Sequence, residues 1–342
     1  MNEAPENGVG RPRIERLQPA AAISGGDFEI VGSSLAPAGE NRPNVRFGEV
    51  SGRIVVGGDR RVVVRVPEEA IEGRLVLSYN GAESEPLPCS IGLAIAENLH
   101  PVANPVVDAA GNIYTTRSGT RGENVPVSVF KIDPSFNVRP LVSDIINPTG
   151  LLIDPEGRLL ISSRNDGTIY SVTPDDGKVE VYAEGMGVAT GMALDGEGNL
   201  YVGDRTGTVF KIGSDRQIFV FATLEPSISA YHLTLGPDGD LYVTGPTTSS
   251  FDSVYRIDPK GDVHEHHRGF GRPQGLTFAP DGSLLVAASY RGRRGVFRIA
   301  PDDAITQAVS GPGIVGVALA PTGELIVATS STIYRIGGVT YV

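Results

Sequence analysis

The stretch DGEGNLYVGDRTGTVFKI, residues 195–212, contains a tight turn, an apolar alternating run, a polar loop and a second apolar run. Its turn glycine, Gly198, has counterparts at spacings of 41–46 residues, namely Gly111, Gly157, Gly239, Gly282 and Gly323. An alternating run such as DLYVT follows each glycine, and a second run such as VYRI comes later. This period predicts six copies of one antiparallel four-stranded unit.

A repeat of this length is typical of one blade of a β-propeller, in which neighbouring sheets bury the faces that a single sheet leaves open. We therefore expect a six-bladed propeller over residues 105–342. Turns such as the Pro-Asp-Gly at residues 237–239 suit it, because Gly tolerates positive φ and Asp bonds to the local backbone. The turns lack the five spaced oxygen ligands of a calcium loop, so we interpret them as structural.

The composition favours an all-β chain, since 40% of the 342 residues are hydrophobic, only 6% are aromatic and 44 are glycine. No apolar run is long enough to span a membrane, and the polar start of the chain lacks the apolar core of a secretory signal. The single cysteine, Cys89, rules out an internal disulfide, which suits a reducing compartment as well as a chain whose leader was removed. We expect a cytoplasmic protein in which Cys89 is a structural apolar residue.

The formal net charge of −11 argues against a nucleic-acid partner, because phosphate neutralisation needs a basic face.

Residues 1–10 are polar, and we expect a disordered tail there. From residue 11 to residue 90, short alternating runs recur with Gly and Pro between them, which predicts a small β-sandwich. The motifs FEIVG at 28–32, VRFG at 45–48 and VRVP at 64–67 follow in an order that resembles an IPT/TIG domain, an immunoglobulin-like fold. The resemblance implies a spacer or docking module. DNA binding, its other use in that family, is disfavoured because the arginines here alternate with acids.

Residues 91–104 form the junction. Its apolar half, residues 91–95, is either a linker strand or an outer strand that closes the propeller ring, and residues 339–342 are the alternative closing strand.

In a propeller, the loop leading into the innermost strand and the loop between the second and third strands lie on one face, around the central channel. We call this face the polar loop face; its inter-strand loops are residues 117–124, 162–166, 204–206, 245–252, 289–295 and 330–331. Eight arginines fall on it against four acids: Arg117, Arg121, Arg164, Arg205, Arg272, Arg291, Arg293 and Arg294 against Glu123, Asp166, Asp204 and Asp252. On a chain of net charge −11 this segregation indicates a small anionic ligand or an acidic protein partner. The alternative is that the arginines are solvated and paired with local acids.

The remaining predicted binding residues on this face are Asn147, Asn165, Tyr231, His232, Gln274 and Tyr290. His232 is the best acid/base candidate, because we expect it at the channel mouth beside Tyr231. The alternative is a histidine that only bonds a loop carbonyl. The run His264-Glu265-His266-His267 places His264 and His266 on one strand face, but it falls in an outermost strand, which favours a solvated edge over a metal site.

The common catalytic signatures G-x-S-x-G, H-E-x-x-H and the P-loop are absent. One G-x-G-x-x-G occurs at residues 311–316, but strand-like runs and no helix follow it, so it indicates a turn leading into a strand.

The repeat consensus, over residues 98–338, resembles NHL-repeat propellers and the gluconolactonase and strictosidine-synthase-like superfamily; without any Trp the chain lacks the WD signature. In the lactonases a Glu, an Asn and an Asp hold a divalent ion in the channel. The resemblance puts Ala103, Tyr231 and Gln274 at these positions. Because these side chains offer no carboxylate, we expect neither a metal nor a cofactor.

Two hypotheses follow. The first is a non-catalytic binding or scaffold protein, an accessory subunit of a larger complex, that recognises an acidic or anionic partner through the arginine-rich polar loop face. The second is a lactone hydrolase or lyase with a diverged, metal-free centre that uses His232 and Tyr231. Carbohydrate binding ranks last, since Tyr231 and Tyr290 are the only tyrosines on these loops.

Overall fold

The computed structural model describes residues 11–36, 42–71, 73–120 and 122–338, and all regular elements in them are β-strands. They form two compact units. The first is the chain up to Leu93 together with Gln307–Pro312, and the second is Ala94–Thr306 with the chain from Gly313 onward. The described residues include no helix with the length and apolar character that crossing a bilayer requires. The predicted tail, residues 1–10, lies outside the described residues.

The first unit is built from nine short strands. They are β1 (Arg13–Gln18), β2 (Ala21–Ala22), β3 (Asp27–Ser33), β4 (Asn44–Phe47), β5 (Val50–Val56), β6 (Arg61–Arg65), β7 (Gly73–Tyr79), β8 (Ala82–Glu83) and β9 (Leu87–Ile91). Their hydrogen-bonded order is β1-β3-β6-β5-β4-β7-β9-β2, with β8 beside β7.

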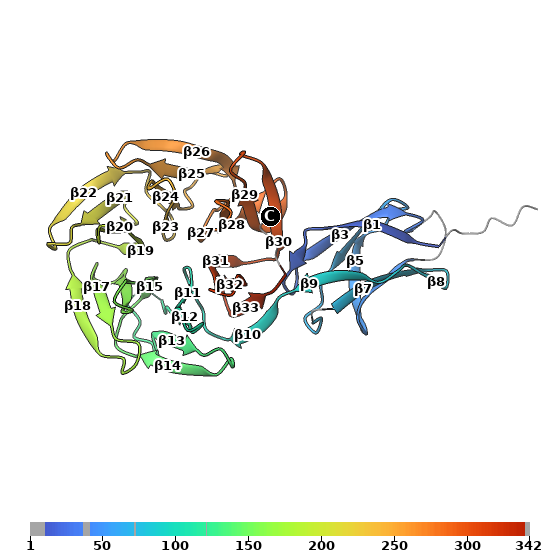
Figure 1. Cartoon of the computed structure of the whole chain (residues 1–342), viewed down its shortest axis with the longest axis horizontal. Coiled ribbons are helices and arrows are strands. Elements are labelled where there is room, and N and C mark those ends of the chain that lie inside the picture. The colour runs from blue at the N-terminus through green and yellow to red at the C-terminus, as the bar shows by residue number, and fades with distance from the viewer. Residues whose placement is uncertain (1–10, 37–41, 72, 121, 339–342) are drawn as a thin grey trace, which may run out of the picture. The chain divides into compact units, whose positions relative to one another are not determined.

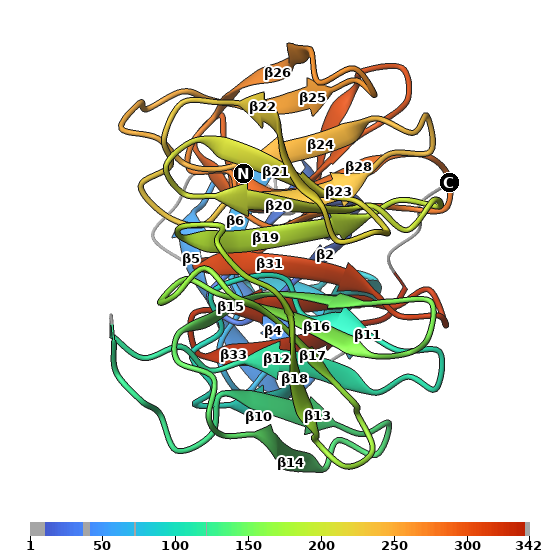
Figure 2. The same cartoon turned by 90° about the vertical axis from the view of Figure 1, so that its left-hand side faces the viewer.

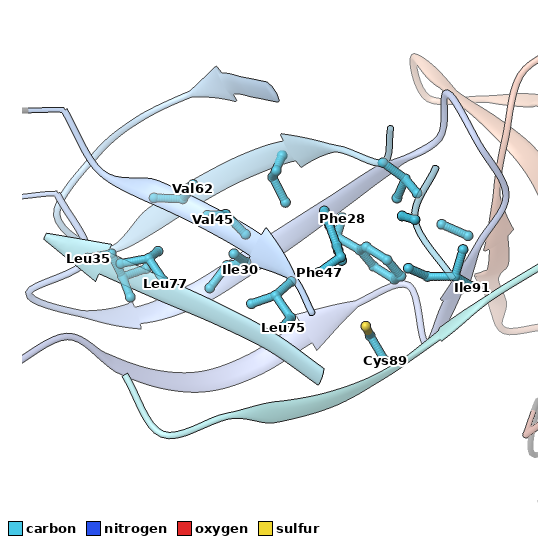
Figure 3. Close-up of a cluster of buried hydrophobic side chains, with 14 residues drawn as sticks. Phe28, Ile30, Leu35, Val45, Phe47, Val62, Leu75, Leu77, Cys89 and Ile91 are labelled. Carbon is cyan, nitrogen blue, oxygen red and sulfur yellow. The ribbon is translucent and has the colours of Figure 1, made fainter. Parts of the chain in front are cut away.

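Alternation of buried and accessible side chains gives this unit its core. In β3 and β6 every second residue is buried, so Phe28 and Val64 point inward. The Phe28 and Phe47 rings pack with their centroids 6.0 Å apart in the cluster of Figure 3. Cys89 belongs to the same cluster, and its thiol lies 3.4 Å from the carbonyl of Gly73. Its burial confirms the interpretation of Cys89 as a structural residue.

The second unit is a β-propeller. Five separate four-stranded sheets are arranged around a centre, as Figure 1 shows: β11–β14, β15–β18, β19–β22, β23–β26, and β31–β33 with β10. The strands β27, β28, β29 and β30 are neighbours in the same order within a larger sheet. Seen from the side, inner strands such as β19 and β31 run through the thickness of the ring (Figure 2).

The strands fall into four sets by their place in a sheet. The innermost are β11 (Val106–Val107), β15 (Pro148–Ile153), β19 (Ala189–Leu194), β23 (His232–Leu235), β27 (Leu276–Phe278) and β31 (Ile314–Leu319). The second are β12 (Ile113–Thr116), β16 (Leu159–Ser163), β20 (Leu200–Asp204), β24 (Leu241–Thr244), β28 (Leu284–Tyr290) and β32 (Leu325–Thr329). The third are β13 (Val129–Ile132), β17 (Ile169–Val172), β21 (Thr208–Ile212), β25 (Asp252–Ile257), β29 (Arg293–Ile299) and β33 (Thr332–Ile336). The outer ones are β14 (Val138–Val142), β18 (Val179–Ala183), β22 (Ile218–Thr223), β26 (Val263–Phe270), β30 (Ile305–Ser310) and β10 (Leu93–Glu97).

The predicted turn glycines all adopt positive φ, as Gly198 (φ 82) and Gly239 (φ 84) illustrate. Beside Gly198, the carboxylate of Asp195 accepts hydrogen bonds from the Glu197 and Asn199 backbones, from the Asn199 amide and from the Tyr201 hydroxyl. These donors occupy the oxygens that a calcium ion would need, so the acidic turn is a structural element.

The outer edge of the sheet β31–β33 is covered by β10, which comes from the other end of this unit. Ile95 of β10 is only 8% exposed and shares a core with Ile326 and Ile333. This pairing joins the start of the propeller to its last sheet and removes two open edges. It is the first of the two closures considered above; residues 339–342 lie outside the described residues.

We predict that Ile95→Ala lowers the free energy of unfolding by about 2–4 kcal/mol, because it empties part of the core that holds the closing strand. Urea unfolding of the full chain measures this. Leu93→Ala is the matched control on the same strand: Leu93 is 46% exposed, so a change within about 0.5 kcal/mol is expected. Equal losses in the two variants would refute the role of β10 as a packed closing strand.

We also predict that Asp195→Asn destabilises the chain at neutral pH by about 1–2 kcal/mol. Burial alone would raise the pKa of Asp195, but the hydrogen bonds from Asn199, Glu197 and Tyr201 together hold that pKa below its usual value. The stabilisation is therefore present above about pH 4 and is lost as the pH falls through the lowered pKa.

Urea midpoints measured from pH 7 down to pH 2 should show the gap between the natural chain and Asp195→Asn closing below about pH 4. Asp215→Asn is the control, because the Asp215 carboxylate accepts a hydrogen bond only from the Gln217 backbone. A gap that does not depend on pH would contradict the assignment.

Candidate functional site

The loops of the polar loop face are joined to one another by hydrogen bonds. Asn147, just before β15, donates its amide to the carbonyls of Gly119 and Thr120 in the β12–β13 loop. In the next sheets, the backbone of Arg205 donates to Val188, and Ser227 donates to the carbonyl of Arg205. The structure therefore joins the loop between the second and third strands of one sheet to the segment that leads into the innermost strand of the next sheet, as Asn147 and Ser227 illustrate.

Arg164 and Arg205 lie on corresponding loops of neighbouring sheets, β16–β17 and β20–β21. The Arg164 guanidinium donates through Nη2 to the Ser118 hydroxyl at 3.2 Å and to the Gly119 carbonyl at 3.1 Å. Its Nε is buried and has no hydrogen-bond partner among the residues that the structure describes. Arg205 donates to the carbonyl of Ser227 at 3.1 Å and to that of Ile228 at 2.9 Å.

The charges of these two arginines are not neutralised by a carboxylate. Within the described part of the chain, the polar partners of Arg164 and Arg205 are hydroxyl and carbonyl oxygens. Burial lowers the pKa of Arg164, and the positive charge of Arg205 lowers it further. The partly buried Arg164 thus lies within electrostatic reach of the exposed Arg205, and a bound anion would relieve the repulsion between the two charges.

The four acids of the polar loop face bind other donors. Asp204 is buried and accepts from the Val188 and Thr206 backbones and from the Thr206 hydroxyl. Asp252, also buried, accepts twice from Thr247. Asp166 accepts from Thr168 and Tyr170, and Glu123 accepts from Thr120. Asp204, predicted as a binding residue, therefore stabilises its loop by accepting hydrogen bonds from Val188 and Thr206.

The structure corrects the interpretation of Asn147, Tyr231 and His232 as groups that face a ligand. Asn147 is fully buried, and its side chain also accepts from the Gly122 backbone, so all of its polar atoms serve the loop. Tyr231 is 2% exposed, its hydroxyl donates to the carbonyl of Glu225, and burial raises its pKa. His232 is 2% exposed, and its Nε2 has no hydrogen-bond partner. The innermost strands converge here, which encloses these side chains.

His232 occupies a position at which the repeat otherwise has glycine or asparagine. The six equivalent residues are Asn104, Gly150, Gly191, His232, Gly275 and Gly316. A Cβ atom on Gly191 would lie 2.4 Å from the carbonyl oxygen of Tyr231, so neighbouring inner strands touch through their backbones. Asn104 fills the position with an amide that donates to Leu276 and accepts from Val317. A comparison of the six copies at this one position would have identified Asn104 from the sequence as a residue that differs from the glycines of the repeat.

A cavity of about 450 Å³ lies among the inner strands. Residues from β11, β15, β19, β23, β27 and β31 line it, among them Leu151, Met192, Leu233, Leu276 and Val317. Ala103, Tyr231 and Gln274, at the positions that hold the metal in lactonases, provide no carboxylate, and Tyr231 is engaged with a loop carbonyl. These residues do not fit a hard divalent ion.

The hairpin β28–β29 carries the other predicted arginines. Its turn residues Arg291 and Gly292 both have positive φ, which gives a tight two-residue connection. Arg291 lies over the ring of Tyr290, 5.1 Å from its centroid, and Tyr290 packs on Phe270 and Phe297. Tyr290 is thereby a half-buried support for the hairpin.

The remaining predicted residues differ in their exposure. Arg272, Arg291, Arg293 and Arg294 are exposed, Asn165 is exposed, and Gln274 is partly buried. Hydrogen bonds from Thr120 lower the pKa of Glu123, and the charge of Arg117 adds to this effect. Arg121 lies outside the described residues.

We predict that His232 stays neutral down to about pH 4, because complete burial lowers its pKa to about 4. Between pH 6.5 and pH 4 the unfolded chain takes up a proton that the folded chain does not, so this residue costs stability as the pH falls. Histidine NMR titration, assigned with His232→Gln, measures the pKa. A His232 resonance that titrates near pH 6.5, the ordinary value for a histidine, would contradict the enclosed position.

The sequence matches no protein-family model and no curated protein. Solved structures do resemble the fold. One is an auxiliary nutrient binding protein from Bacteroides ovatus, with 12% sequence identity and a TM-score of 0.55. The match spans 96% of this chain and 98% of that protein. Another is a gluconolactonase from Xanthomonas campestris, with 16% sequence identity and a TM-score of 0.60. The match spans 72% of this chain and 89% of that protein.

A third is a catalytically inactive virginiamycin B lyase from Staphylococcus aureus with quinupristin, with 15% sequence identity and a TM-score of 0.51. The match spans 97% of this chain and 96% of that protein. At these identities the likeness shows the fold, and the chain is similar in fold to gluconolactonase-like and virginiamycin B lyase-like β-propellers.

Proposed function

We propose that this chain is a non-catalytic binding protein whose propeller holds an anionic group, a carboxylate or a phosphate, with Arg164 and Arg205. The observation that carries the proposal is the pair of guanidinium groups on neighbouring loops without a carboxylate partner, one of them with a buried and unpartnered Nε. The ligand is either a small anion or an acidic segment of a partner protein, and the chain then acts as an accessory subunit.

The two arginines are well prepared for such a ligand. Their bonds to the Gly119, Ser227 and Ile228 carbonyls hold the guanidinium planes, so little side-chain entropy is lost on binding. An arginine guanidinium has five N–H donors, and those not used by the loops remain for an anion. Charge-assisted hydrogen bonds in a partly buried place are stronger than at an exposed surface.

The finer architecture belongs to the same proposal. We take β27–β30 as a sixth blade of an NHL-like, gluconolactonase-like propeller, because the repeat has six copies in sequence and these four strands have the order of the other sheets. We take the first unit as an IPT/TIG-like sandwich that serves as a spacer or docking module. The fold shared with a nutrient binding protein over nearly the whole of both chains supports a binding role for the two units together.

A lactone hydrolase or lyase with a diverged, metal-free centre is the second candidate. The buried Nε2 of His232 favours it, because this atom has no hydrogen-bond partner among the described residues and the next residue, Leu233, lines the cavity among the inner strands. Turnover of a lactone or cyclic depsipeptide panel that His232→Gln abolishes would support this candidate, whereas an inactive natural chain would eliminate it.

We predict that Arg205→Gln weakens the binding of anionic ligands by about 10–100-fold, since each charge-assisted bond contributes about 1.5–3 kcal/mol. Isothermal titration of the full chain with citrate and with inorganic phosphate distinguishes the two small-anion chemistries. Pull-down from native extract distinguishes an acidic protein. Arg164→Met removes the charge of the second arginine and should weaken the same binding.

Arg216→Gln is the matched control, because Arg216 is an arginine on the β21–β22 turn that stacks on Tyr182, 3.3 Å from its ring centroid. Replacing Arg291, Arg293 and Arg294 by Glu distinguishes binding at the β28–β29 hairpin from binding at the Arg164–Arg205 pair. Binding that Arg205→Gln and Arg164→Met leave unchanged would eliminate the assigned site, and binding lost only in the hairpin variant would move it to β28–β29.

A further inference from the structure

The histidine run on β26 is a solvated edge only in its first half, His264 and Glu265. The outer strand β26 lies on the rim of the propeller (Figure 1). His264 remains exposed, but His266 and His267 are both partly buried. A β-bulge explains the difference. Tyr255 pairs with Glu265 and Val254 pairs with His267, so His266 is the extra residue.

The bulge brings two consecutive imidazoles side by side. In a regular strand, neighbouring side chains point to opposite faces, whereas a bulge turns both residues toward one side. The ring centroids of His266 and His267 are 4.5 Å apart. The edge of the Tyr242 ring packs against His266 at 5.1 Å, and the Tyr242 hydroxyl is fixed on Asp238. The His266 ring is therefore held in place by a side chain from β24, two strands away in the same sheet.

A carboxylate from the next turn completes the group. Asp303 lies between β29 and β30, and its positive φ of 67° marks a tight turn. His266, His267 and Asp303 each have a ligand atom within 4.8 Å of the others. Nε2 of His267 is 3.3 Å from Oδ1 of Asp303. Nevertheless, this nitrogen is buried and has no hydrogen-bond partner.

The distance and the missing hydrogen bond together indicate a shared ligand. Two atoms that bind one tetrahedral ion at about 2.0–2.1 Å stand about 3.3–3.4 Å apart and point at the ion, and not at each other.

We propose that His266, His267 and Asp303 bind a divalent transition-metal ion of the zinc class and thereby clip β26 to the β29–β30 turn. Two imidazoles and one carboxylate suit Zn²⁺ and its neighbours in the first transition row, whereas Ca²⁺ and Mg²⁺ prefer a shell of oxygens. Water completes the coordination, since Asp303 is 73% exposed. The site is independent of the arginine pair and of the channel.

The experiment uses the full chain without an affinity tag, stripped with EDTA and dialysed. Titration with ZnCl₂ should show one ion per chain, and thermal unfolding should move to higher temperature with added Zn²⁺. Co²⁺ in place of Zn²⁺ should give the strong visible absorption of a four-coordinate site. Mg²⁺ and Ca²⁺ at the same concentrations should produce neither effect.

Asp303→Asn and His267→Gln should each weaken Zn²⁺ binding by at least about tenfold. Asp303 is exposed, so its variant should keep the far-ultraviolet spectrum and the unfolding temperature of the metal-free chain. His264→Gln is the matched control on the same strand and should bind as the natural chain does. Absence of stoichiometric Zn²⁺ binding, or binding that Asp303→Asn leaves unchanged, overturns the proposal.

Discussion

The packing of neighbouring sheets against one another is the interaction on which the propeller depends. A four-stranded sheet made only of alternating apolar residues has two faces to bury, and each is buried by the next sheet in the ring. Thus Tyr114 of β12 packs in one core with Leu159 of β16 in the next sheet. On the other face of β16, Leu160 packs in a second core with Met192 of β19. Around the channel the contact is so close that backbones meet, as at Gly191 and Tyr231. In such a ring, polar and charged side chains are accommodated at the loops, at the outer rim and at the few inner positions that are not glycine.

The same packing explains which charged groups are free to act. Loops that connect tightly packed strands need acceptors for their backbone N–H groups, and Asp204 and Asp252 serve this purpose as buried caps. These carboxylates keep their negative charge, but among the described residues they bond to backbone and hydroxyl donors and not to Arg164 or Arg205. The two arginines bond instead to hydroxyl and carbonyl oxygens. The basic character of this face results from its eight arginines against four acids.

The boundaries between sheets at the rim follow another rule. An outer strand is constrained on one side only, so it tolerates a bulge, and the bulge in β26 places His266 and His267 against the β29–β30 turn. Histidine at such a boundary contacts a neighbour that is 36 residues away in sequence. The arginine pair, the enclosed His232 and the histidine pair are therefore three distinct environments of one repeated unit.

The sequence by itself determined the repeat, the β-propeller, the turn glycines and the face on which the loops gather. It could do so because strand alternation and positive-φ turns depend on residues close together in the chain. Tertiary structure decided the rest. Whether β10 closes the ring, whether His232 is enclosed, and which oxygens hold Arg164 all depend on strands from other copies of the repeat. A local pattern does not contain the register shift that aligns His266 with His267, nor the turn that carries Asp303 to them. Contacts between distant segments are set by the packing of the whole ring, and the chemistry of this protein is located in those contacts.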